Sequence, residues 1–303
     1  MRHKLIVMAL FLSALLPVAA HARLRVAAST TDLASIASSI GGEQVEVFAI
    51  ARATADPHRV EALPSAMVRV AKAQLYLRVG LGLDQWSGSI VDGSRNRRLV
   101  IVDCSRGVRV LEKPAGRVDA SMGDVHPEGN PHYWLDPRNG AIVAHTIAEA
   151  FATADPVNAA QYRARAEAFG RDAEAAFQHG RTTVAAMKSK TILTYHRSWP
   201  YLADAFGLEV ADTIEPVPGI PPTARHLADL QKLIPARGVS VLLQEPYFSA
   251  DAGKFLQRTA GVRVVTMSPS CDDIAAGSYL AHVQAVLAAV ANVPAAAAAG
   301  GHK

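Results

Sequence analysis

The sequence predicts an α/β protein in which two parallel-sheet lobes with flanking helices are joined by one long backbone helix. Short apolar segments alternate with helical patterns in both halves of the chain, which is typical of parallel strands covered by helices. Between the halves, a stretch rich in Ala, Arg, Glu and Gln carries apolar residues at spacings of three and four, the pattern of a helix. The length of 303 residues is enough for two domains of ordinary size.

The first lobe is expected over residues 23–150. Its expected strands are residues 24–28, 45–50, 75–79 and 99–102. Helical patterns cover residues 33–40 and 64–72, and another begins at Asp136-Pro137, because Asp is a good N-cap and Pro is favoured in the first turn. Residues 111–131 form a polar loop with Gly and Pro. The loop is longer than most connections, and such loops tend to be functional.

The linking helix is expected over residues 151–189, with a start signal at Asp155-Pro156. Its expected buried positions are Tyr162, Ala166, Phe169, Ala173 and Phe177. A helix of this length would run roughly 45–50 Å at 1.5 Å per residue. It could be a surface helix of a single domain, but its length favours a connection between two lobes.

The second lobe is expected over residues 190–292. Its expected strands are residues 191–194, 239–243 and 262–266, with a further strand at Val210. Its expected helices are residues 201–206, 223–233 and 279–290, with a further helix at Phe255. Residues 293–303 are rich in Ala and Gly and are expected to be a disordered tail.

The N-terminus has the features of a secretory signal. Arg2 and Lys4 precede an apolar run over residues 5–20, and Ala20-His21-Ala22 has the small-x-small form of a cleavage site. This pattern predicts a signal peptide over residues 1–22 that is removed on export. A retained membrane anchor is the alternative, but the run is short for a span. We therefore expect a soluble periplasmic protein.

The charge and the cysteine content limit the partners and the chemistry that this chain can have. The formal net charge is +4, and Lys and Arg are scattered rather than clustered with aromatic residues, so no nucleic-acid partner is predicted. We expect a monomer. Cys104 and Cys271 are far apart along the chain. They could pair in an oxidising compartment, but spacing alone leaves their pairing open.

Histidines at separated points of the chain predict a metal site. His58 and His196 stand just beyond expected strands, and His132 stands at the end of the long polar loop. Ligands of open α/β sheets bind outside the carboxyl ends of the strands, so imidazoles from both lobes could meet there and hold Zn(II). A lone histidine is more often a surface or satisfied core residue. His126 lies in the same loop as His132 and could cover the cleft or capture metal transiently.

Short motifs follow one another along the chain in an order that identifies a family. They are Asp56-Pro57-His58, Gly80-Leu81-Gly82-Leu83-Asp84-Gln85-Trp86, the run 123–137, Tyr195-His196 with residues 201–208, Glu245-Pro246-Tyr247-Phe248-Ser249 and Ser278-Tyr279-Leu280. In this order they resemble the zinc- and manganese-binding periplasmic proteins of bacterial metal ABC transporters. Each motif alone is weak, but the set is specific and covers essentially the whole chain after the signal peptide.

The resemblance implies that His58, His132 and His196 bind a metal ion between two lobes joined by a rigid helix. It also implies that the cargo is delivered to an ABC transporter permease. A His at the third ligand position is associated with zinc-type members. Three imidazoles agree with this, because Mn(II) prefers more oxygen ligands than Zn(II) does.

The chain departs from the family pattern at the fourth ligand. An Asp is expected just after the last strand, but Ser268 occupies that place. Glu245, Asp272 and Asp273 are the other candidates, and water could also fill the position. Asp136 is expected to cap the following helix and could brace His132 from behind.

The resulting hypothesis is a periplasmic binding protein, not an enzyme, that carries Zn(II) to a permease. A zinc hydrolase with an open His₃ site is one alternative, although the chain has no His-Glu-x-x-His motif. A periplasmic metallochaperone or interaction protein with a degenerate metal site is another.

Overall fold

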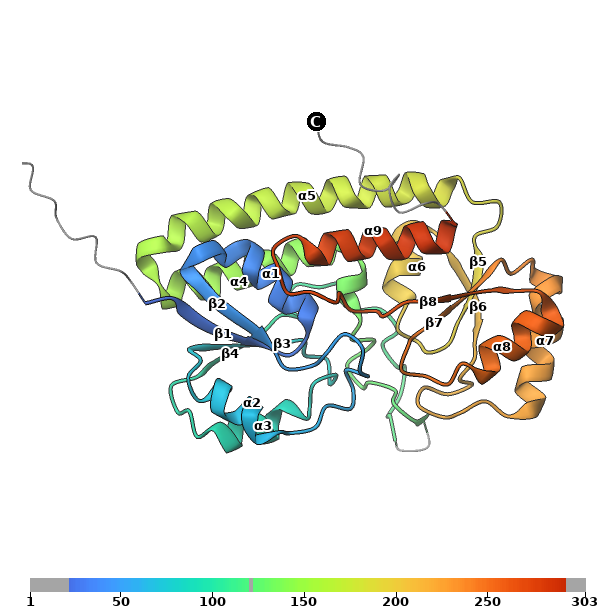
Figure 1. The fold of residues 1–303 in the computed structure, drawn as a ribbon, viewed down its shortest axis with the longest axis horizontal. Coiled ribbons are helices and arrows are strands. Elements are labelled where there is room, and N and C mark those ends of the chain that lie inside the picture. The colour runs from blue at the N-terminus through green and yellow to red at the C-terminus, as the bar shows by residue number, and fades with distance from the viewer. Residues whose placement is uncertain (1–21, 120–121, 293–303) are drawn as a thin grey trace, which may run out of the picture.

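Each half of the chain folds around a four-stranded parallel sheet (Figure 1). The first sheet has the order β2-β1-β3-β4 and the second has the order β6-β5-β7-β8. The strands of the first sheet are β1 (Leu24–Ala28), β2 (Val45–Ala49), β3 (Leu75–Arg78) and β4 (Val100–Asp103). Those of the second are β5 (Thr191–Thr194), β6 (Glu209–Thr213), β7 (Val241–Gln244) and β8 (Arg263–Thr266). The two lobes therefore repeat one topology, and the predicted fold class is confirmed.

Helices cover both faces of each sheet, as buried parallel strands require. On the outer faces, separate apolar clusters form under α2 and α3 in the first lobe and under α7 and α8 in the second. These helices are α2 (Pro64–Val70), α3 (Ser87–Ser94), α7 (Ala224–Arg237) and α8 (Asp251–Ala260). The inner faces are covered by α1 (Thr31–Gly41), α4 (Pro137–Ala154), α5 (Ala159–Ala185), α6 (Pro200–Phe206) and α9 (Ser278–Ala291).

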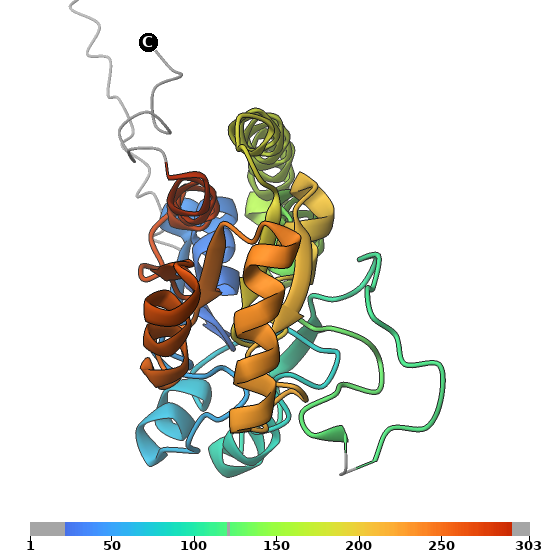
Figure 2. The ribbon, with the colours of Figure 1, turned by 90° about the vertical axis from the view of Figure 1, so that its right-hand side faces the viewer.

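The long helix α5 runs across the top of both lobes, with α9 beside it (Figures 1 and 2). It lies inside the stretch 151–189 expected from the sequence but is shorter at both ends. The last turn of α4 occupies the beginning of that stretch, and Pro156–Asn158 forms a 3-10 turn before α5 begins. Asp155 makes this corner, because its carboxylate accepts hydrogen bonds from Asn158 Nδ2 and Tyr162 Oη, both at 2.7 Å.

One hydrophobic core passes from the first lobe into the second beneath α5. It includes Val26 and Leu77 of the first sheet and Ile192 and Leu243 of the second. The buried residues that α5 contributes are Tyr162, Ala166, Phe169, Ala173, Phe177, Gly180 and Val184, which include all the positions expected from the helical spacing. Because each large apolar side chain stabilises the fold by about 1.5–3 kcal/mol when buried, separating the lobes would be costly.

The structure describes residues 22–119 and 122–292. The predicted signal peptide, apart from Ala22, and the predicted tail 293–303 therefore lie outside the described residues. Within the described part, none of the helices is both long and apolar enough to cross a bilayer. The helix α3 is absent from the sequence-based prediction, since Ser and Gly make up most of its residues and neither favours a helix interior.

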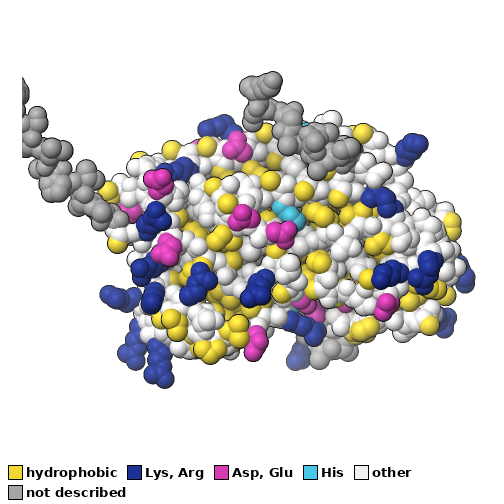
Figure 3. Space-filling view, viewed as in Figure 1, with side chains coloured by type: hydrophobic (Ala, Val, Ile, Leu, Met, Phe, Trp, Pro, Cys, Tyr) yellow, Lys and Arg dark blue, Asp and Glu magenta, His cyan; other side chains and the backbone are white. Residues whose placement is uncertain are grey.

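Cys104 and Cys271 are both buried and free. The pairing that the sequence left open is not formed in this structure. Charged side chains of both signs are dispersed over the face shown in Figure 3, in agreement with the scattered distribution along the sequence.

Two glycines of α5 should respond oppositely to substitution by alanine. A Cβ at Gly170 would meet no atom of the described residues within 4 Å, whereas a Cβ at Gly180 would lie 2.5 Å from the Phe206 ring and 2.6 Å from Leu287. Gly170→Ala should stabilise the protein by up to about 1 kcal/mol through helix propensity. Gly180→Ala should destabilise it by about 1–3 kcal/mol through overpacking. Urea unfolding midpoints of the two variants would measure this, and equal midpoints would contradict the packing described for α5.

Candidate metal centre

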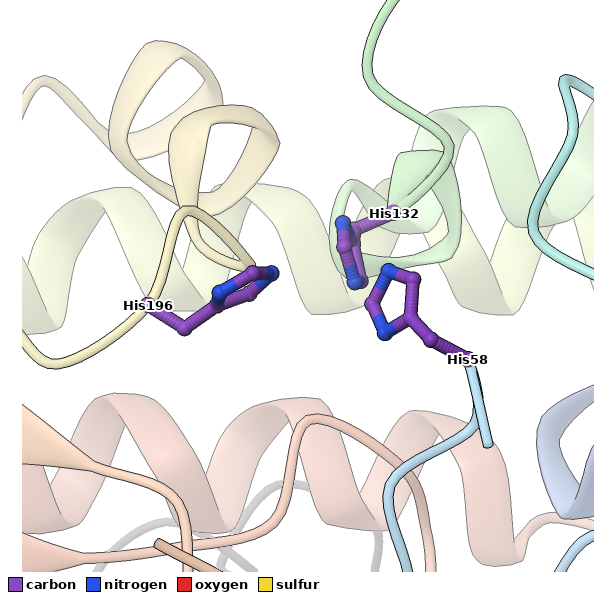
Figure 4. A group of neighbouring side chains, drawn as sticks. All are labelled: His58, His132 and His196. Carbon is purple, nitrogen blue, oxygen red and sulfur yellow. The ribbon is translucent and has the colours of Figure 1, made fainter. Parts of the chain in front are cut away.

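Three histidines predicted from the sequence meet between the lobes (Figure 4). His58 lies in the loop after β2, His132 lies just before α4, and His196 lies two residues beyond β5. One ring nitrogen from each falls within 4.8 Å of the others. The ring centroids are 5.2 Å apart for His58 and His132, 5.3 Å for His58 and His196, and 5.9 Å for His132 and His196.

These spacings match a tetrahedral metal site. A zinc–nitrogen bond of about 2.0–2.1 Å puts each imidazole centre roughly 3.2 Å from the metal, and tetrahedral angles then separate two centres by about 5.2 Å. Two of the separations lie within 0.1 Å of this value, and the third, between His132 and His196, is wider. The rings are therefore placed to share one small cation after a small approach of the ligand nitrogens.

Two of the histidines are held by the same local device, an Asx-Pro-His segment. Asp56 Oδ1 accepts hydrogen bonds from the backbone N–H of His58 at 2.9 Å and from its Nδ1 at 2.8 Å. Asn130 Oδ1 does the same for His132, with both distances 3.0 Å. With Nδ1–H donated, Nε2 is left as the free lone pair. The Nε2 atoms of His58 and His132 are buried and have no partner among the described residues.

His196 is held by a residue distant in sequence. The pairing of β5 with β6 continues past both strands, because the N–H of Glu215 donates to Tyr195 O at 3.0 Å. This places Glu215 beside His196, and its Oε2 accepts a hydrogen bond from Nδ1 at 2.7 Å. The same carboxylate oxygen accepts a hydrogen bond from the backbone N–H of Gly219 at 2.9 Å. Sequence reasoning missed both Glu215 and Asn130.

The protonation behaviour of the ligand candidates differs. Burial, reinforced by the neighbouring His58 and His196, lowers the pKa of His132 well below its usual range. Burial would also lower the pKa of His196, but the hydrogen bond to Glu215 and the nearby Glu245 charge outweigh it and raise the pKa. Protonation therefore competes with metal binding at a higher pH for His196 than for His132.

The carboxylates considered as a fourth ligand lie outside the triad. Among the described residues, the metal-ligand grouping contains the three histidines and no acid. Asp272 and Asp273 are exposed. Glu245 is fully buried near His196. Its Oε1 accepts hydrogen bonds from Ser198 Oγ at 2.7 Å and Trp199 Nε1 at 2.9 Å, while Oε2 has no partner among the described residues. Burial raises the pKa of Glu245 to about 7.

Ser268, which stands where the family pattern has an Asp, is used differently. Its hydroxyl donates to the carbonyl of Ala53 at 2.6 Å, a residue of the loop that carries His58. Nearby, the Trp134 Nε1 donates to Pro269 O at 2.9 Å. The segment after β8 therefore fastens the second lobe to the first.

Asn130 also connects the lobes. Its Nδ2 donates to the carbonyl of Arg197, at 2.8 Å, and to Glu112 Oε2, at 3.0 Å. Its own carbonyl accepts a hydrogen bond from Tyr201 Oη at 2.9 Å. The expectation that Asp136 caps α4 is confirmed, since it accepts from the N–H of Arg138 at 2.9 Å. The carboxylate of Asp136 pairs with Arg138, and the residue that braces His132 is Asn130.

His126 lies next to the three histidines. Its ring centroid is 5.3 Å from that of His58, and with His132 and His196 it lines a cavity of about 40 Å³. Burial and the neighbouring histidines lower the pKa of His126 to about 4. The loop that carries it, between β4 and α4, stands away from the helical layers on one side of the molecule (Figure 2).

The fold and the inter-lobe histidine cluster define a two-lobed metal-binding protein of the solute-binding class. Residues 26–293 match the family described as "Zinc-uptake complex component A periplasmic", and the chain belongs to this family.

Individual relatives agree with this assignment. A high-affinity zinc uptake system protein ZnuA from Brucella abortus is 29% identical over 138 residues, which span 46% of this chain and 41% of that protein. A zinc-binding protein AdcA from Streptococcus pyogenes is 22% identical over 83% of this chain and 51% of its own length. Each of these two matches therefore spans about half of the relative or less.

Solved structures share the fold. A crystal structure of ZnuA superposes with a TM-score of 0.78 at 25% identity, covering 90% of this chain and 99% of that one. The solute-binding protein FpvC from Pseudomonas aeruginosa, in complex with Mn²⁺, superposes with a TM-score of 0.74 at 24% identity, covering 89% and 98%.

His132 and His196 should have different pKa values in the metal-free protein. Nitrogen NMR of the imidazole rings at pH 6.5 should show His196 mostly protonated, because its pKa is raised above the ordinary 6.5, and His132 neutral, because its pKa is lowered. Glu215→Gln should move the His196 midpoint downwards, since burial then dominates, and leave His132 neutral. A wild-type midpoint below 6.5 for His196 would contradict the role given to Glu215.

Proposed function

We propose that this chain is the zinc-binding component of a periplasmic ABC-type uptake system. His58, His132 and His196 capture Zn(II) as cargo between the lobes, and the loaded protein delivers it to a membrane permease. The observation that carries this proposal is the convergence of three imidazoles from two lobes at separations close to those of a tetrahedral zinc site. The family description and the names of the relatives support zinc as the cargo.

The donor set favours Zn(II) over Mn(II). Imidazole nitrogen suits zinc, whereas manganese is better served by carboxylate, carbonyl and water oxygens. No carboxylate joins the three histidines in the described part of the chain.

The family description supports transport, and neither it nor the relatives' names favour the hydrolase or metallochaperone alternatives. We infer that the protein works as a carrier. A carrier must present its cargo without unfolding, and the shared core and the cross-lobe hydrogen bonds of Ser268 and Asn130 leave loop movement as the means of release, more than wide hinge closure.

Zinc binding should depend on each member of the triad. His132→Ala should weaken Zn(II) binding by about 100-fold or more, since even loss of a partner behind a ligand costs about 10–100-fold. His58→Ala and His196→Ala should act similarly. Competition against a chromophoric chelator measures the affinity, and His145→Ala, an exposed histidine on α4, is the matched control.

The same assay tests the pH dependence. Zinc must displace a proton from His196, whose pKa is raised, so the affinity should be lower at pH 6 than at pH 8. Failure of the wild-type protein to retain one zinc per chain would refute the proposal.

Delivery to a permease can be tested in the host cell. A strain lacking this gene should grow poorly with an extracellular zinc chelator, and the wild-type gene should restore growth. The His132→Ala gene should fail to restore growth, while the His145→Ala gene should succeed. Rescue by manganese instead of zinc would show that the cargo has been assigned wrongly.

A further inference from the structure

His126 lies next to the triad and has the features of a further metal ligand. Its ring centroid lies 5.3 Å from that of His58, the same separation as between His58 and His196. Its Nε2 is buried and has no hydrogen-bond partner among the described residues, which is also true of the Nε2 atoms of His58 and His132. Because buried polar groups are normally satisfied, three such nitrogens at one place indicate a shared ligand.

The other side of the His126 ring is anchored. The ring forms a hydrogen bond with the backbone of Leu81, and its Nδ1 lies where a Cβ on Gly82 would approach to 3.3 Å. Gly82 has φ +81, which lets the backbone pass close to the ring. The anchoring leaves Nε2 as the atom free to bind a cation in the cavity that His126 lines with His132 and His196.

The segment around His126 contacts both lobes. The N–H of Asp124 donates to Pro218 O at 2.9 Å, and its carboxylate pairs with Arg59 at 3.5 Å. Gly123 has φ +66, and a Cβ there would overlap the Pro218 carbonyl. Pro218 follows closely on Glu215, the partner of His196, so the position of His126 is tied to the second-lobe side of the centre.

Most of the groups that could compete for the fourth position are bound or exposed elsewhere. The Ser268 hydroxyl is bound to Ala53, and Asp272 and Asp273 are exposed. Glu245 has one oxygen without a partner among the described residues, and the Glu245→Gln variant below decides between it and His126.

We propose that His126 is the fourth ligand and that this chain binds Zn(II) through four imidazoles, a proposal that rests on the proposed function. The nitrogens of His126 lie outside the 4.8 Å grouping of the triad, so the segment 123–129 moves slightly inwards when the metal arrives. Three preformed ligands capture the ion and the fourth closes the site. A site closed by four imidazoles has no open position for water, unlike a catalytic zinc site.

Direct observation of the ring comes first. In wild-type protein with imidazole nitrogens labelled, addition of one equivalent of ZnCl₂ should shift Nε2 of His126 to the range of a metal-bound nitrogen together with Nε2 of His58, His132 and His196. A His126 signal that stays unchanged while the other three shift would overturn the proposal.

Affinity measurements separate this proposal from the proposed function. His126→Ala should weaken Zn(II) binding by about 10–100-fold, with His145→Ala as control and thermal melting as a check of folding. In Co(II)-loaded protein it should also change the visible absorption bands, since water replaces a nitrogen. Glu245→Gln should leave the Co(II) absorption bands unchanged, because Glu245 is not a ligand. If His132→Ala weakens binding but His126→Ala does not, or if Glu245→Gln changes the Co(II) bands, the fourth ligand is wrong. If neither histidine matters, the proposed function fails.

A double-mutant cycle tests how His126 is held. Gly123→Ala should undock the segment from Pro218 and weaken Zn(II) binding by a factor similar to that of His126→Ala. The double variant should lose little more than either single variant, because both changes remove the same ligand. Additive losses would show that the glycine acts on zinc binding by a route other than His126 and would overturn the docking argument.

Discussion

The separation between the two sheets is the constraint on which the metal centre depends. A site with ligands from both lobes requires the lobes to keep a fixed separation. That distance is set by a core that passes under α5 and α9, and by hydrogen bonds that join Trp134 to Pro269, Ser268 to Ala53 and Asn130 to Arg197. Each such bond is worth about 1 kcal/mol, so the packing dominates, and the bonds set the alignment of the lobes.

Within that frame, each imidazole is oriented from behind. Asp56, Asn130 and Glu215 each accept a hydrogen bond from an Nδ1 atom. Two further residues complete this scaffold. The Trp86 Nε1 donates to Pro57 O at 2.8 Å and holds the His58 segment, and Asp84 accepts from the N–H groups of Val79 and Gly80. Asp84 thereby fills the end of the first sheet, while the corresponding end of the second sheet carries His196 and Glu245.

Much of this architecture is predictable from the sequence because buried parallel strands are short, apolar and followed by turns, and because strand ends mark ligand positions. Asn130 was also within reach: it precedes His132 as Asp56 precedes His58, with proline between them. Glu215 was not, because it meets His196 only through a β5–β6 pairing whose register shifts between Ile192 and Leu193. The helix α3 was not predicted because its composition disfavours a helix. Its packing against the first sheet overrides that preference.

The two free cysteines acquire a meaning from the kind of cargo proposed. The thiolate is the form of cysteine that binds metal and that is oxidised. An ionised thiol inside a zinc carrier would therefore compete with the carrier's own site for zinc. Burial raises the pKa of both Cys104 and Cys271 far above the ordinary value, and neither reaches solvent. A buried, protonated thiol is a poor metal ligand and a poor nucleophile. The interior of the protein therefore holds sulfur in a form that competes weakly for zinc.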